Sequence, residues 1–408
     1  MRETSLGDTP RVVDPAAEIQ SLAAFETRQP GTDAERRAAN HLKRRLDELD
    51  REARLEPTLV WPRWYVAHLI HALLAIAGSA VAVGNALIGT ILVAIAAVST
   101  VGDLTWRLPL IRRITGRRAS QNVVSTESSA RPGTLILTAH YDTGRGGAAF
   151  GRLLNWPIGP AQGFVGSIAL LLVTTIARLA GLDNTVLAIV QFVPTVVLIV
   201  SLPYLADIAL SGPVPGANDN ASGVATVLRL AERYGGDLDH LDVWVLFPGA
   251  QEAGAAGTRA WLKQHRHSLD PLTTIVLNVD EVGAGTVRYA AKEGPLLALR
   301  QHPRLVELCR QLTEEDEDDR RYLAQPTAAR RPTDGYAARA RGLPAITISC
   351  APAPHHHRPT DTPEQVDPLA LERAFGFCSE LIELIDEKIG PDIAATAAAR
   401  RGASFTPS

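Results

Sequence analysis

Two long apolar stretches interrupt an otherwise polar chain. The first, residues 64–102, contains no Asp, Glu, Lys or Arg, and the second covers residues 163–206. A membrane-spanning helix needs about 20 apolar residues, so each stretch has about the length of two spans. Turn-forming residues interrupt the stretches near their middles, at 84–85 and 181–184. The pattern therefore predicts two transmembrane helical hairpins, at residues 64–104 and 162–206.

The alternative interpretation is that these segments are buried helices of a large soluble domain. Soluble helices rarely remain apolar on every face for so long, which favours the membrane. A hairpin returns the chain to the side that it left, so all polar parts share one side. Eight arginines flank the first hairpin, whereas the two turns carry no basic residue and only Arg178 lies near one of them. This bias predicts a multi-pass protein of the cell membrane with its polar domain in the cytoplasm.

The rest of the chain alternates strand-like and helix-like segments. Strands are predicted at 134–139, 242–247, 274–279 and 344–349, and helices at 33–49, 221–234, 257–266, 304–312 and 368–388. Apolar strands that alternate with amphipathic helices indicate an α/β fold with a doubly wound, mostly parallel sheet. The predicted polar domain is split into residues 15–62, 119–160 and 207–390. The small, polar tail, residues 391–408, is predicted to be disordered.

The composition limits the possible partners and compartment. The net charge is −3 and charged residues make up 21% of the chain, which gives no reason to expect a nucleic-acid partner. Three cysteines, Cys309, Cys350 and Cys378, are scattered without a CxxC pair. This pattern fits a reducing compartment, as does an N-terminal segment without the apolar core of a signal peptide.

Polar side chains follow the predicted strands at the edge where a doubly wound sheet binds its ligands. The four strands are followed in turn by His140 and Asp142, by Gln251 and Glu252, by Asp280 and Glu281, and by His355, His356 and His357, while Asp219 precedes the helix at 221–234. Imidazole and carboxylate groups without a thiolate suit zinc or another borderline divalent metal. Five ligands are too many for one tetrahedral ion and suit two ions that share a carboxylate. The sequence therefore predicts two divalent metal ions, zinc above all.

Each feature has an alternative interpretation when taken alone. His140 with Asp142 is a common pair at a strand end, and three histidines between prolines could be an exposed low-complexity patch. Asp219 could cap the helix that follows it, and Asp280 and Glu281 could be surface acids. Their occurrence together, with one feature at each strand end, is what indicates a metal site.

Seven stretches of the polar part occur in the order of a known family. They are RQPGTDAERRAANHL, LILTAHYDT, PGANDNASGVATVL, QEAGAAGTRAW, LNVDEVG, TDGYAARARGLPAITI and HHHRPTDTPEQVD. With them the chain resembles metallopeptidase family 28, the co-catalytic di-zinc aminopeptidases of the aminopeptidase Y type. The resemblance covers nearly the whole polar part, and it implies a sheet of the zinc-peptidase type in a membrane-anchored member that acts on peptides or small amides.

The resemblance also implies a role for each residue of the predicted centre. His140 and Asp280 would bind one ion, Glu252 and His357 would bind the other, and Asp219 would bridge both.

Two choices within this set depend on neighbouring residues. Asp142 would orient His140 and fix its tautomer. His357 is preferred over the two histidines before it, because the ligand in the family lies four residues before an acidic residue and a threonine. Asp361 and Thr362 match that pair.

The chain departs from the family in two ways. The family places its bridging aspartate about a dozen residues after the HxD motif, whereas here the second hairpin fills a far longer gap before Asp219. The family also has a Glu-Glu pair whose first member is the general base, and here that position is Gln251. An amide accepts no proton, and loss of a general base costs about 10²–10⁴-fold in rate. Two residues are candidates to replace the missing general base, His356 and Glu281. Many relatives have a tyrosine that polarises the substrate carbonyl at the position of His356.

The sequence thus predicts a membrane-anchored zinc-dependent aminopeptidase that hydrolyses the N-terminal residues of peptides through a metal-bound water. The alternative is a pseudopeptidase that binds metal and peptide without efficient turnover, because Gln251 replaces the base. A third interpretation, a transport component, has less support, since the spans contain almost no ionisable residue beyond His68, His71 and Arg178. The expected partners are a peptide or small amide substrate and the lipid bilayer.

Overall fold

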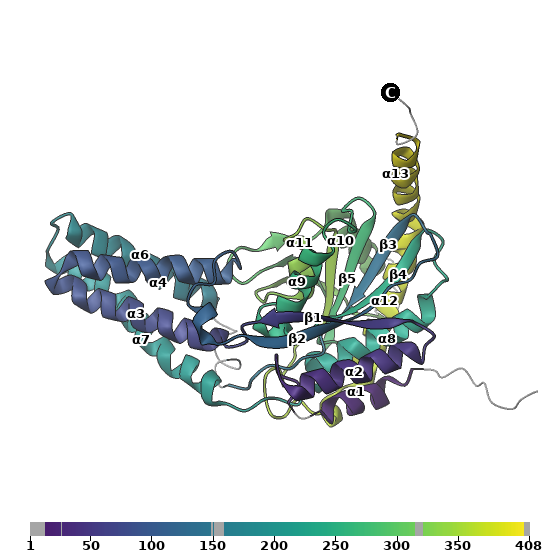
Figure 1. The fold of residues 1–408 in the computed structure, drawn as a ribbon, viewed down its shortest axis with the longest axis horizontal. Helices are drawn as coiled ribbons and strands as arrows, with labels where there is room; N and C mark the ends of the chain where they lie inside the picture. The colour runs from purple at the N-terminus through teal and green to yellow at the C-terminus, as the bar shows by residue number, and fades with distance from the viewer. Residues whose placement is uncertain (1–12, 26, 148–149, 151–158, 315–320, 404–408) are drawn as a thin grey trace, which may run out of the picture.

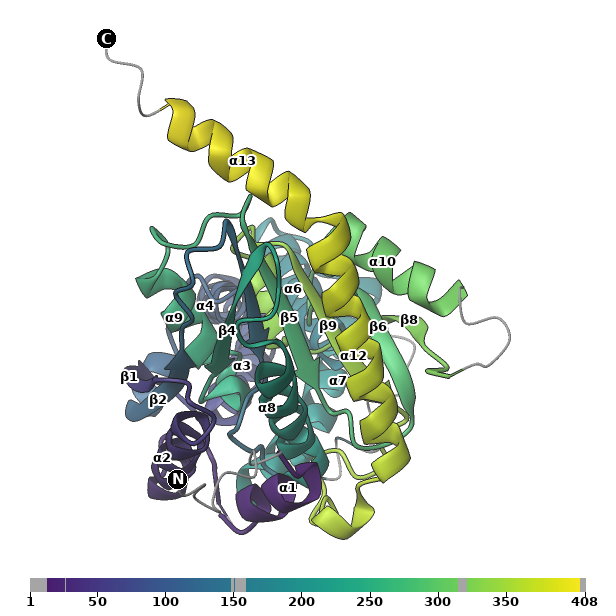
Figure 2. The same ribbon diagram turned by 90° about the vertical axis from the view of Figure 1, so that its right-hand side faces the viewer.

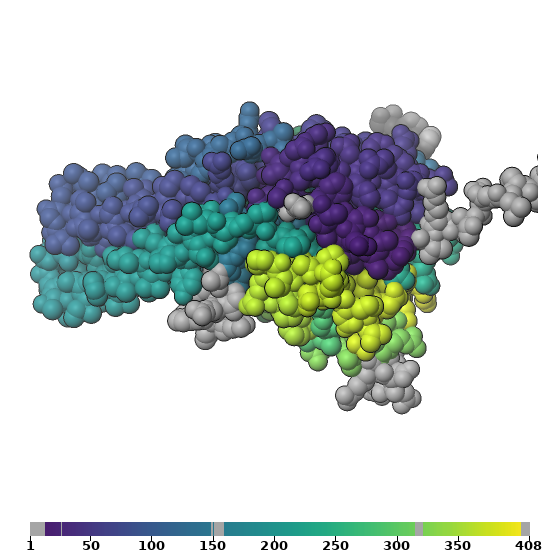
Figure 3. All heavy atoms as spheres, turned by 90° about the horizontal axis from the view of Figure 1, so that it is seen from below, coloured from purple at the N-terminus to yellow at the C-terminus, as the bar shows by residue number. Residues whose placement is uncertain are grey.

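The computed structural model describes residues 13–25, 27–147, 150, 159–314 and 321–403. They form two parts, an α/β domain around a central sheet and a bundle of four long apolar helices that extends to one side of it (Figure 1). Seen from below, the bundle is a separate lobe beside the domain (Figure 3). The molecule is therefore elongated, with its polar and apolar parts at opposite ends.

The four predicted strands form the parallel centre of the sheet. In spatial order they are β4 (Leu241–Phe247), β3 (Gly133–Thr138), β5 (Thr274–Asp280) and β9 (Ala345–Ala351). β3 pairs in parallel with both β4 and β5, and β5 pairs in parallel with β9. The carboxyl ends of these strands therefore meet at one edge of the sheet.

Further strands extend this centre on both sides. On one side, β2 (Arg118–Ser125) pairs antiparallel to β4, and β1 (Ala53–Val60) pairs antiparallel to β2. On the other side, β6 (Thr286–Glu293) pairs antiparallel to β9. Two short strands, β7 (Leu299–Arg300) and β8 (Gln325–Ala329), pair with β6. The sheet, with nine strands among the described residues, is therefore mixed, and only its centre is uniformly parallel as predicted. The pattern of β1 explains why the sequence did not reveal it, since only three of its eight residues are buried.

Helices cover both faces of the sheet (Figure 2). One face shares its apolar core with α1 (Pro15–Ala23), α2 (Asp33–Asp47), α8 (Gly223–Tyr234), α10 (Pro303–Glu314) and α12 (Pro368–Lys388), and the other with α9 (Ala256–Gln264) and α11 (Asp334–Arg339). Within β3, Leu135 and Leu137 belong to the first core and Ile136 to the second. Successive side chains of a strand point to opposite faces, so a strand covered on both sides is apolar throughout.

The bundle occupies the positions of the predicted hairpins. Its helices are α3 (Trp64–Gly84), α4 (Ala86–Leu104), α6 (Pro160–Leu179) and α7 (Thr185–Leu210). Within the described part of the chain, these four are long and apolar enough to cross a membrane. Large apolar side chains point outward, and Val83, Val186 and Phe192 are 66%, 70% and 66% exposed. Contiguous apolar surface of this kind is rare on soluble monomers.

Both hairpins leave the domain at the edge where the parallel strands end. The second hairpin lies in the connection from β3 to α8, and the first joins β1 to β2. β2 begins beyond the end of β4, because Val123 pairs with Phe247 in an antiparallel register. The bundle is therefore attached beside the edge where the sequence places the candidate site.

The C-terminal tail differs from the prediction. Instead of a disordered segment, it contains helix α13 (Gly390–Ala403), which continues beyond α12 away from the domain (Figure 2), while residues 404–408 lie outside the described residues. Ile393 is buried in the first core, and Asp392 pairs with Arg304 at 2.7 Å. The alanine-rich run has high helix propensity, which outweighs its lack of large apolar residues.

Candidate metal centre

His140, Asp219 and Asp280 form one group at the carboxyl ends of the central strands. His140 comes two residues after β3, and Asp280 is the last residue of the neighbouring β5. The His140 Nε2 atom lies 3.3 Å from Asp219 Oδ1 and 3.5 Å from Asp280 Oδ1. All three residues are buried, and their ligand atoms lie within 4.8 Å of one another. This geometry can hold one cation.

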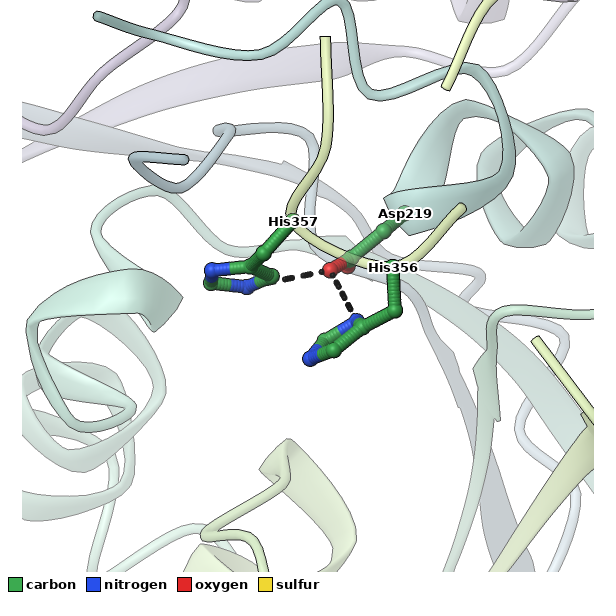
Figure 4. A group of neighbouring side chains, drawn as sticks. All are labelled: Asp219, His356 and His357. Carbon is green, nitrogen blue, oxygen red and sulfur yellow. Dashed lines mark ion pairs between the residues drawn. The ribbon is translucent and has the colours of Figure 1, made fainter. Parts of the chain in front are cut away.

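A second group shares Asp219 with the first. His357, in the loop after β9, places its Nε2 atom 3.3 Å from Asp219 Oδ2 (Figure 4). The same nitrogen lies 3.1 Å from Glu252 Oε1, which belongs to the short helix η3 (Gln251–Ala253) after β4. His356 Nδ1 lies 3.1 Å from Asp219 Oδ2 as well. The structure thus brings together the five ligand residues proposed from the sequence and adds His356 beside them.

Backbone carbonyls orient both histidines of the proposed ligand set. The Nδ1–H of His140 donates to the carbonyl oxygen of Asp142 at 3.1 Å, and the Nδ1–H of His357 donates to that of Arg145 at 2.9 Å. A carbonyl oxygen only accepts, so each Nδ1 carries a proton, and Nε2 is the nitrogen that faces the carboxylates and could bind a cation placed among them. Metal-ligating histidines are commonly oriented in this way.

The side chain of Asp142 supports the turn that carries Glu252. Its Oδ1 accepts the backbone N–H of Gln251 at 2.9 Å, and its Oδ2 accepts that of Glu252 at 3.0 Å. The carboxylate also lies 3.5 Å from His140 Nδ1. The role proposed for Asp142 is therefore divided: its backbone carbonyl orients His140, and its carboxylate positions η3.

A buried aspartate positions the backbone that leads into the shared ligand. Asp361 Oδ1 accepts the N–H of Asn218 at 2.7 Å, and Oδ2 accepts that of Asp219 at 3.1 Å. Burial raises the pKa of Asp361 to about 6, although these hydrogen bonds oppose the change. Asn220 adds a link to the end of β5, because its Oδ1 accepts the N–H of Glu281 at 2.9 Å. From the sequence alone, Asp361 indicates only which of the three histidines is the ligand.

Arg28 is a second residue that sequence reasoning missed. Its guanidinium donates to the carbonyl oxygens of Tyr141 and Gly216, both at 2.9 Å. The side chain is fully buried, and burial lowers its pKa to about 10 despite three neighbouring carboxylates. Arg28 thereby ties the loop of His140 to the loop of Asp219. An arginine in a helix-flanking segment gives no sequence signal for such a role.

Gln251 and His356, the proposed catalytic residues, already have partners. Gln251 Nε2 donates to the carbonyl oxygen of Pro332 at 2.8 Å, a bond that a carboxylate cannot make. His356 Nδ1 lies 2.6 Å from Glu281 Oε1, and Arg331 binds the same carboxylate and approaches both ring nitrogens, at 3.1 and 3.2 Å. Burial disfavours the charge on Glu281, but Arg331 and His356 outweigh it and lower its pKa to about 2.

The electrostatics of the site favour positive charge. Burial opposes protonation of His140 and His357, yet the surrounding carboxylates outweigh it and raise the pKa of both well above the usual range. Burial likewise opposes ionisation of Asp219, but hydrogen bonds from the neighbouring histidines lower its pKa well below the usual range. A cluster of buried carboxylates that attracts protons in this way also attracts metal cations.

Two buried carboxylate oxygens, Asp219 Oδ2 and Asp280 Oδ1, lack a well-aligned hydrogen bond. The atoms that approach them at 3.1–3.5 Å are ring nitrogens of the neighbouring histidines. Such groups are costly unless something satisfies them, and coordination would satisfy both. Gly144 permits the close approach of the second group, since a Cβ there would collide with the His357 ring and lie 2.9 Å from Glu252 Cδ. Imidazole and carboxylate donors without thiolate fit zinc or a similar divalent ion.

A pocket of about 180 Å³ lies beside the second group. Glu252 and His357 line it on one side, Arg63 and Trp64 contribute from the start of α3, and Ile208 contributes from the end of α7. The pocket is therefore bounded by candidate metal ligands and by the ends of bundle helices.

Comparisons with known proteins agree with this geometry. Residues 201–382, which include four of the five proposed ligands, match the model of Peptidase family M28. No curated protein sequence matches the chain significantly. Residues 201–382 are therefore similar to a Peptidase family M28 domain.

Solved structures support the same fold. Similar structures include a Zn-dependent exopeptidase from Parabacteroides distasonis (12% identity, TM-score 0.52, 93% of this chain and 100% of that chain covered). A glutaminyl cyclase from Bacteroides thetaiotaomicron is similar over 92% of this chain and 99% of its own (13% identity, TM-score 0.54). A zinc aminopeptidase from Bacillus subtilis is similar over 92% of this chain and 95% of its own (12% identity, TM-score 0.52). At these identities the likeness establishes the fold alone.

Proposed function

We propose that the protein is a membrane-anchored, zinc-dependent aminopeptidase-like hydrolase that removes N-terminal residues from peptides. The observation that carries this proposal is the pair of histidine–carboxylate groups around Asp219. One group contains His140 and Asp280, the other contains Glu252 and His357, and each offers imidazole and carboxylate ligands at one edge of the sheet. The match to Peptidase family M28 points to peptide bonds as the target.

Two zinc ions bound at these groups would supply Lewis acidity for amide hydrolysis. The residues of the chain hold the ligand atoms in fixed positions. Asp219 presents one oxygen to each group, and the Nδ1–H bonds of His140 and His357 direct both Nε2 lone pairs inward. Burial of the ligands excludes bulk water and strengthens their electrostatic interactions. We place the first residue of the peptide in the pocket beside Glu252.

One observation favours a second candidate function, a catalytically impaired pseudopeptidase that binds metal and peptide. Gln251 stands where the resemblance places the general base, and its amide donates to Pro332 instead of accepting a proton. His356 is a poor replacement, because the guanidinium of Arg331 lies against both of its ring nitrogens. Glu281 is held by the same arginine and histidine.

We also propose that α3, α4, α6 and α7 anchor the protein in a bilayer, with the polar domain in the cytoplasm. Support comes from their mean hydropathy, which lies between 1.6 and 2.4, and from their outward-facing apolar side chains. The arginine-rich flanks of the first hairpin support the orientation. In this arrangement the pocket lies next to the membrane surface, because Trp64 and Ile208 are near helix ends.

A single assay separates the two functions. The full-length protein is purified in detergent and loaded with zinc, and its metal content is measured. Release of 4-nitroaniline from L-leucine 4-nitroanilide is then compared for wild type, Gln251→Glu and Gln251→Ala. An active hydrolase shows wild-type turnover that chelation abolishes.

A pseudopeptidase shows an inert wild type and a gain of about 10²–10⁴-fold in Gln251→Glu, the range attributed to a general base. Gln251→Ala is the matched control, because it loses the bond to Pro332 without gaining a base, and it should stay inert. A wild-type protein that binds no zinc would contradict both functions.

A further inference from the structure

We infer that the helix bundle positions one half of the proposed metal centre, the half formed by Glu252 and His357, through Arg112 and Arg145. The inference rests on the proposed two-ion centre. It assigns to the hairpins a role beyond anchoring, because each hairpin end is bonded to a segment that holds a different ligand of the same proposed ion.

The first link runs from α4 to the helix that carries Glu252. Asp103 is buried in the last turn of α4, and its Oδ1 atom lies 2.7 Å from Arg112 Nε. Arg112 Nη1 in turn donates to the carbonyl oxygen of Ala253 at 2.9 Å. Ala253 directly follows Glu252, so the ion pair fixes the backbone of the proposed ligand from the bundle side.

Aromatic packing reinforces this link. Trp106, just after α4, stacks edge-on against Tyr336 of α11, with ring centroids 5.3 Å apart. The guanidinium of Arg259 lies over the Trp106 ring at 4.4 Å. Gly254 leaves no spare room beneath them, since a Cβ there would lie 3.2 Å from Trp106 Nε1. The segment after α4 is therefore docked on the turn that contains Glu252.

The second link runs from α7 to His357. The Arg145 side chain donates to the carbonyl oxygens of Ile208, Ala209 and Ser211, at 3.0, 3.1 and 2.5 Å, and so satisfies the C-terminal end of α7. The carbonyl oxygen of the same residue accepts the Nδ1–H of His357 at 2.9 Å. One arginine thereby joins the end of the second hairpin to the orientation of a proposed ligand.

Backbone pairing strengthens the second link. Gly146 donates to the carbonyl oxygen of Gly212 at 3.0 Å, and Val214 donates to that of Gly144 at 3.3 Å. The segment after α7 therefore runs alongside the loop that faces His357. A displacement of the helix end is transmitted to this loop through both side-chain and backbone bonds.

The other half of the centre is held inside the domain. Asp280 ends β5, which is paired on both sides by β3 and β9, and His140 is oriented by Asp142. Among the described residues, no hydrogen bond or ion pair joins the side chain of His140 or Asp280 to the bundle. Disturbing the bundle should therefore weaken one ion and spare the other.

Titration of the full-length protein in detergent with Co²⁺, followed by visible absorption, tests the inference. Wild type should bind two equivalents. Arg112→Ala and Arg145→Ala should each lower the affinity for one equivalent by about 10–100-fold, the range known for residues that orient ligands, and keep the other. Arg112→Lys preserves a cation beside Asp103 and should restore part of the loss, which guards against a variant that fails to fold.

Two controls isolate the links. Arg113→Ala changes an exposed neighbour of Arg112, and Arg178→Ala disturbs the far end of the second hairpin, where Arg178 binds Asp183. Both should keep two equivalents at wild-type affinity. Unchanged affinities in Arg112→Ala and Arg145→Ala would overturn the inference, and so would equal loss of both equivalents.

Amide hydrogen exchange of the metal-free protein tests the links to the bundle independently of whether the protein binds metal. The amides of residues 251 and 252 are bonded to Asp142, and Arg112→Ala should accelerate their exchange. A wild-type protein that bound no metal would refute the proposed function. Faster exchange in Arg112→Ala would still support the link from α4, and unchanged exchange would overturn it as well.

Discussion

The two halves of the candidate centre differ in what holds their ligands. His140 and Asp280 lie at the ends of neighbouring parallel strands, and the hydrogen bonds of the sheet fix their spacing. Glu252 and His357 lie in connecting segments whose neighbours are bonded to the helix bundle. The sheet edge alone thus explains one half, whereas the other depends on packing between distant parts of the chain.

Backbone conformation shows the same difference. His357 has a φ of 51°, and Ala250, just before η3, has a φ of 52°, both in the left-handed region. Residues with a side chain rarely adopt this region, at a cost of about 1–3 kcal/mol, and persist there when the surroundings fix them. Neither His140 nor Asp280 has a positive φ, although Glu281, directly after Asp280, has a φ of 54°. Among the five proposed ligands, His357 alone takes this conformation, and it belongs to the half that is bonded to the bundle.

The largest expected effect is loss of both ions from the residue that the halves share. Asp219→Ala should lower the affinity for both equivalents by more than about 100-fold, above the range for residues that only orient ligands. His140→Ala and His357→Ala should each remove one equivalent and keep the other. Metal titration of the three purified variants measures this. Loss of both equivalents in His357→Ala would show that the halves are not separable.

The sequence predicts the first half of the centre better than the second for a physical reason. Apolar runs ending at residues 139 and 279 are strands buried on both faces, and the residues that follow such strands lie at the ligand edge. His140 and Asp280 could therefore be placed from the pattern alone. His357 could be chosen only through the family resemblance, because three adjacent histidines have the same chemistry.

The supporting residues were not predictable from local sequence. Arg28, Arg112 and Arg145 act through carbonyl groups that are distant in sequence or belong to connecting loops. A carbonyl group occurs in every residue, so no residue type marks the partner of such a bond. The outer strands were missed for a related reason, since edge strands need not be apolar. The hairpins, by contrast, could be predicted from the sequence because nearly every residue in them is apolar.

A smaller effect on both halves is expected from the residue beneath Asp219. Asp361→Ala leaves the N–H groups of Asn218 and Asp219 without their acceptors. The shared ligand should shift, and the affinity for both equivalents should fall by about 10–100-fold. Asp367→Ala is a matched control, because Asp367 also accepts a backbone N–H, at the start of α12. Selective loss of one equivalent in Asp361→Ala would argue against a shared ligand.

A still smaller and one-sided effect is expected at Gly144. An added methyl group would press on the His357 ring and on Glu252, so Gly144→Ala should weaken one equivalent by about tenfold, the low end of the range for orienting residues. The other equivalent should keep its wild-type affinity. Gly166→Ala, on α6 with open space around it, is the control. Equal weakening of both equivalents would contradict the division into halves.

The smallest effect on metal binding, none at all, is expected from a buried acid at the end of β6. Glu293 accepts hydrogen bonds from Thr333 and Thr347, at 3.0 and 3.1 Å, and from Gln301. Burial raises its pKa from 4.5 to about 7 despite these bonds. The folded state therefore holds a proton that the unfolded state releases above pH 4.5, and this contribution to stability is lost as the pH rises toward 7.

Glu293→Gln mimics the protonated acid and should remove that pH dependence. The difference in unfolding free energy between variant and wild type should grow by up to about 3 kcal/mol between pH 4.5 and 7 and then level off. Unfolding of both proteins between pH 5 and 8 measures it, and the comparison cancels other groups that titrate in this range. Parallel curves would refute the buried proton.

Because Glu293 supports the sheet and lies outside both ligand groups, the Glu293→Gln variant should bind both equivalents of metal like wild type. A loss confined to the Glu252–His357 half would instead show that the sheet also supports that half.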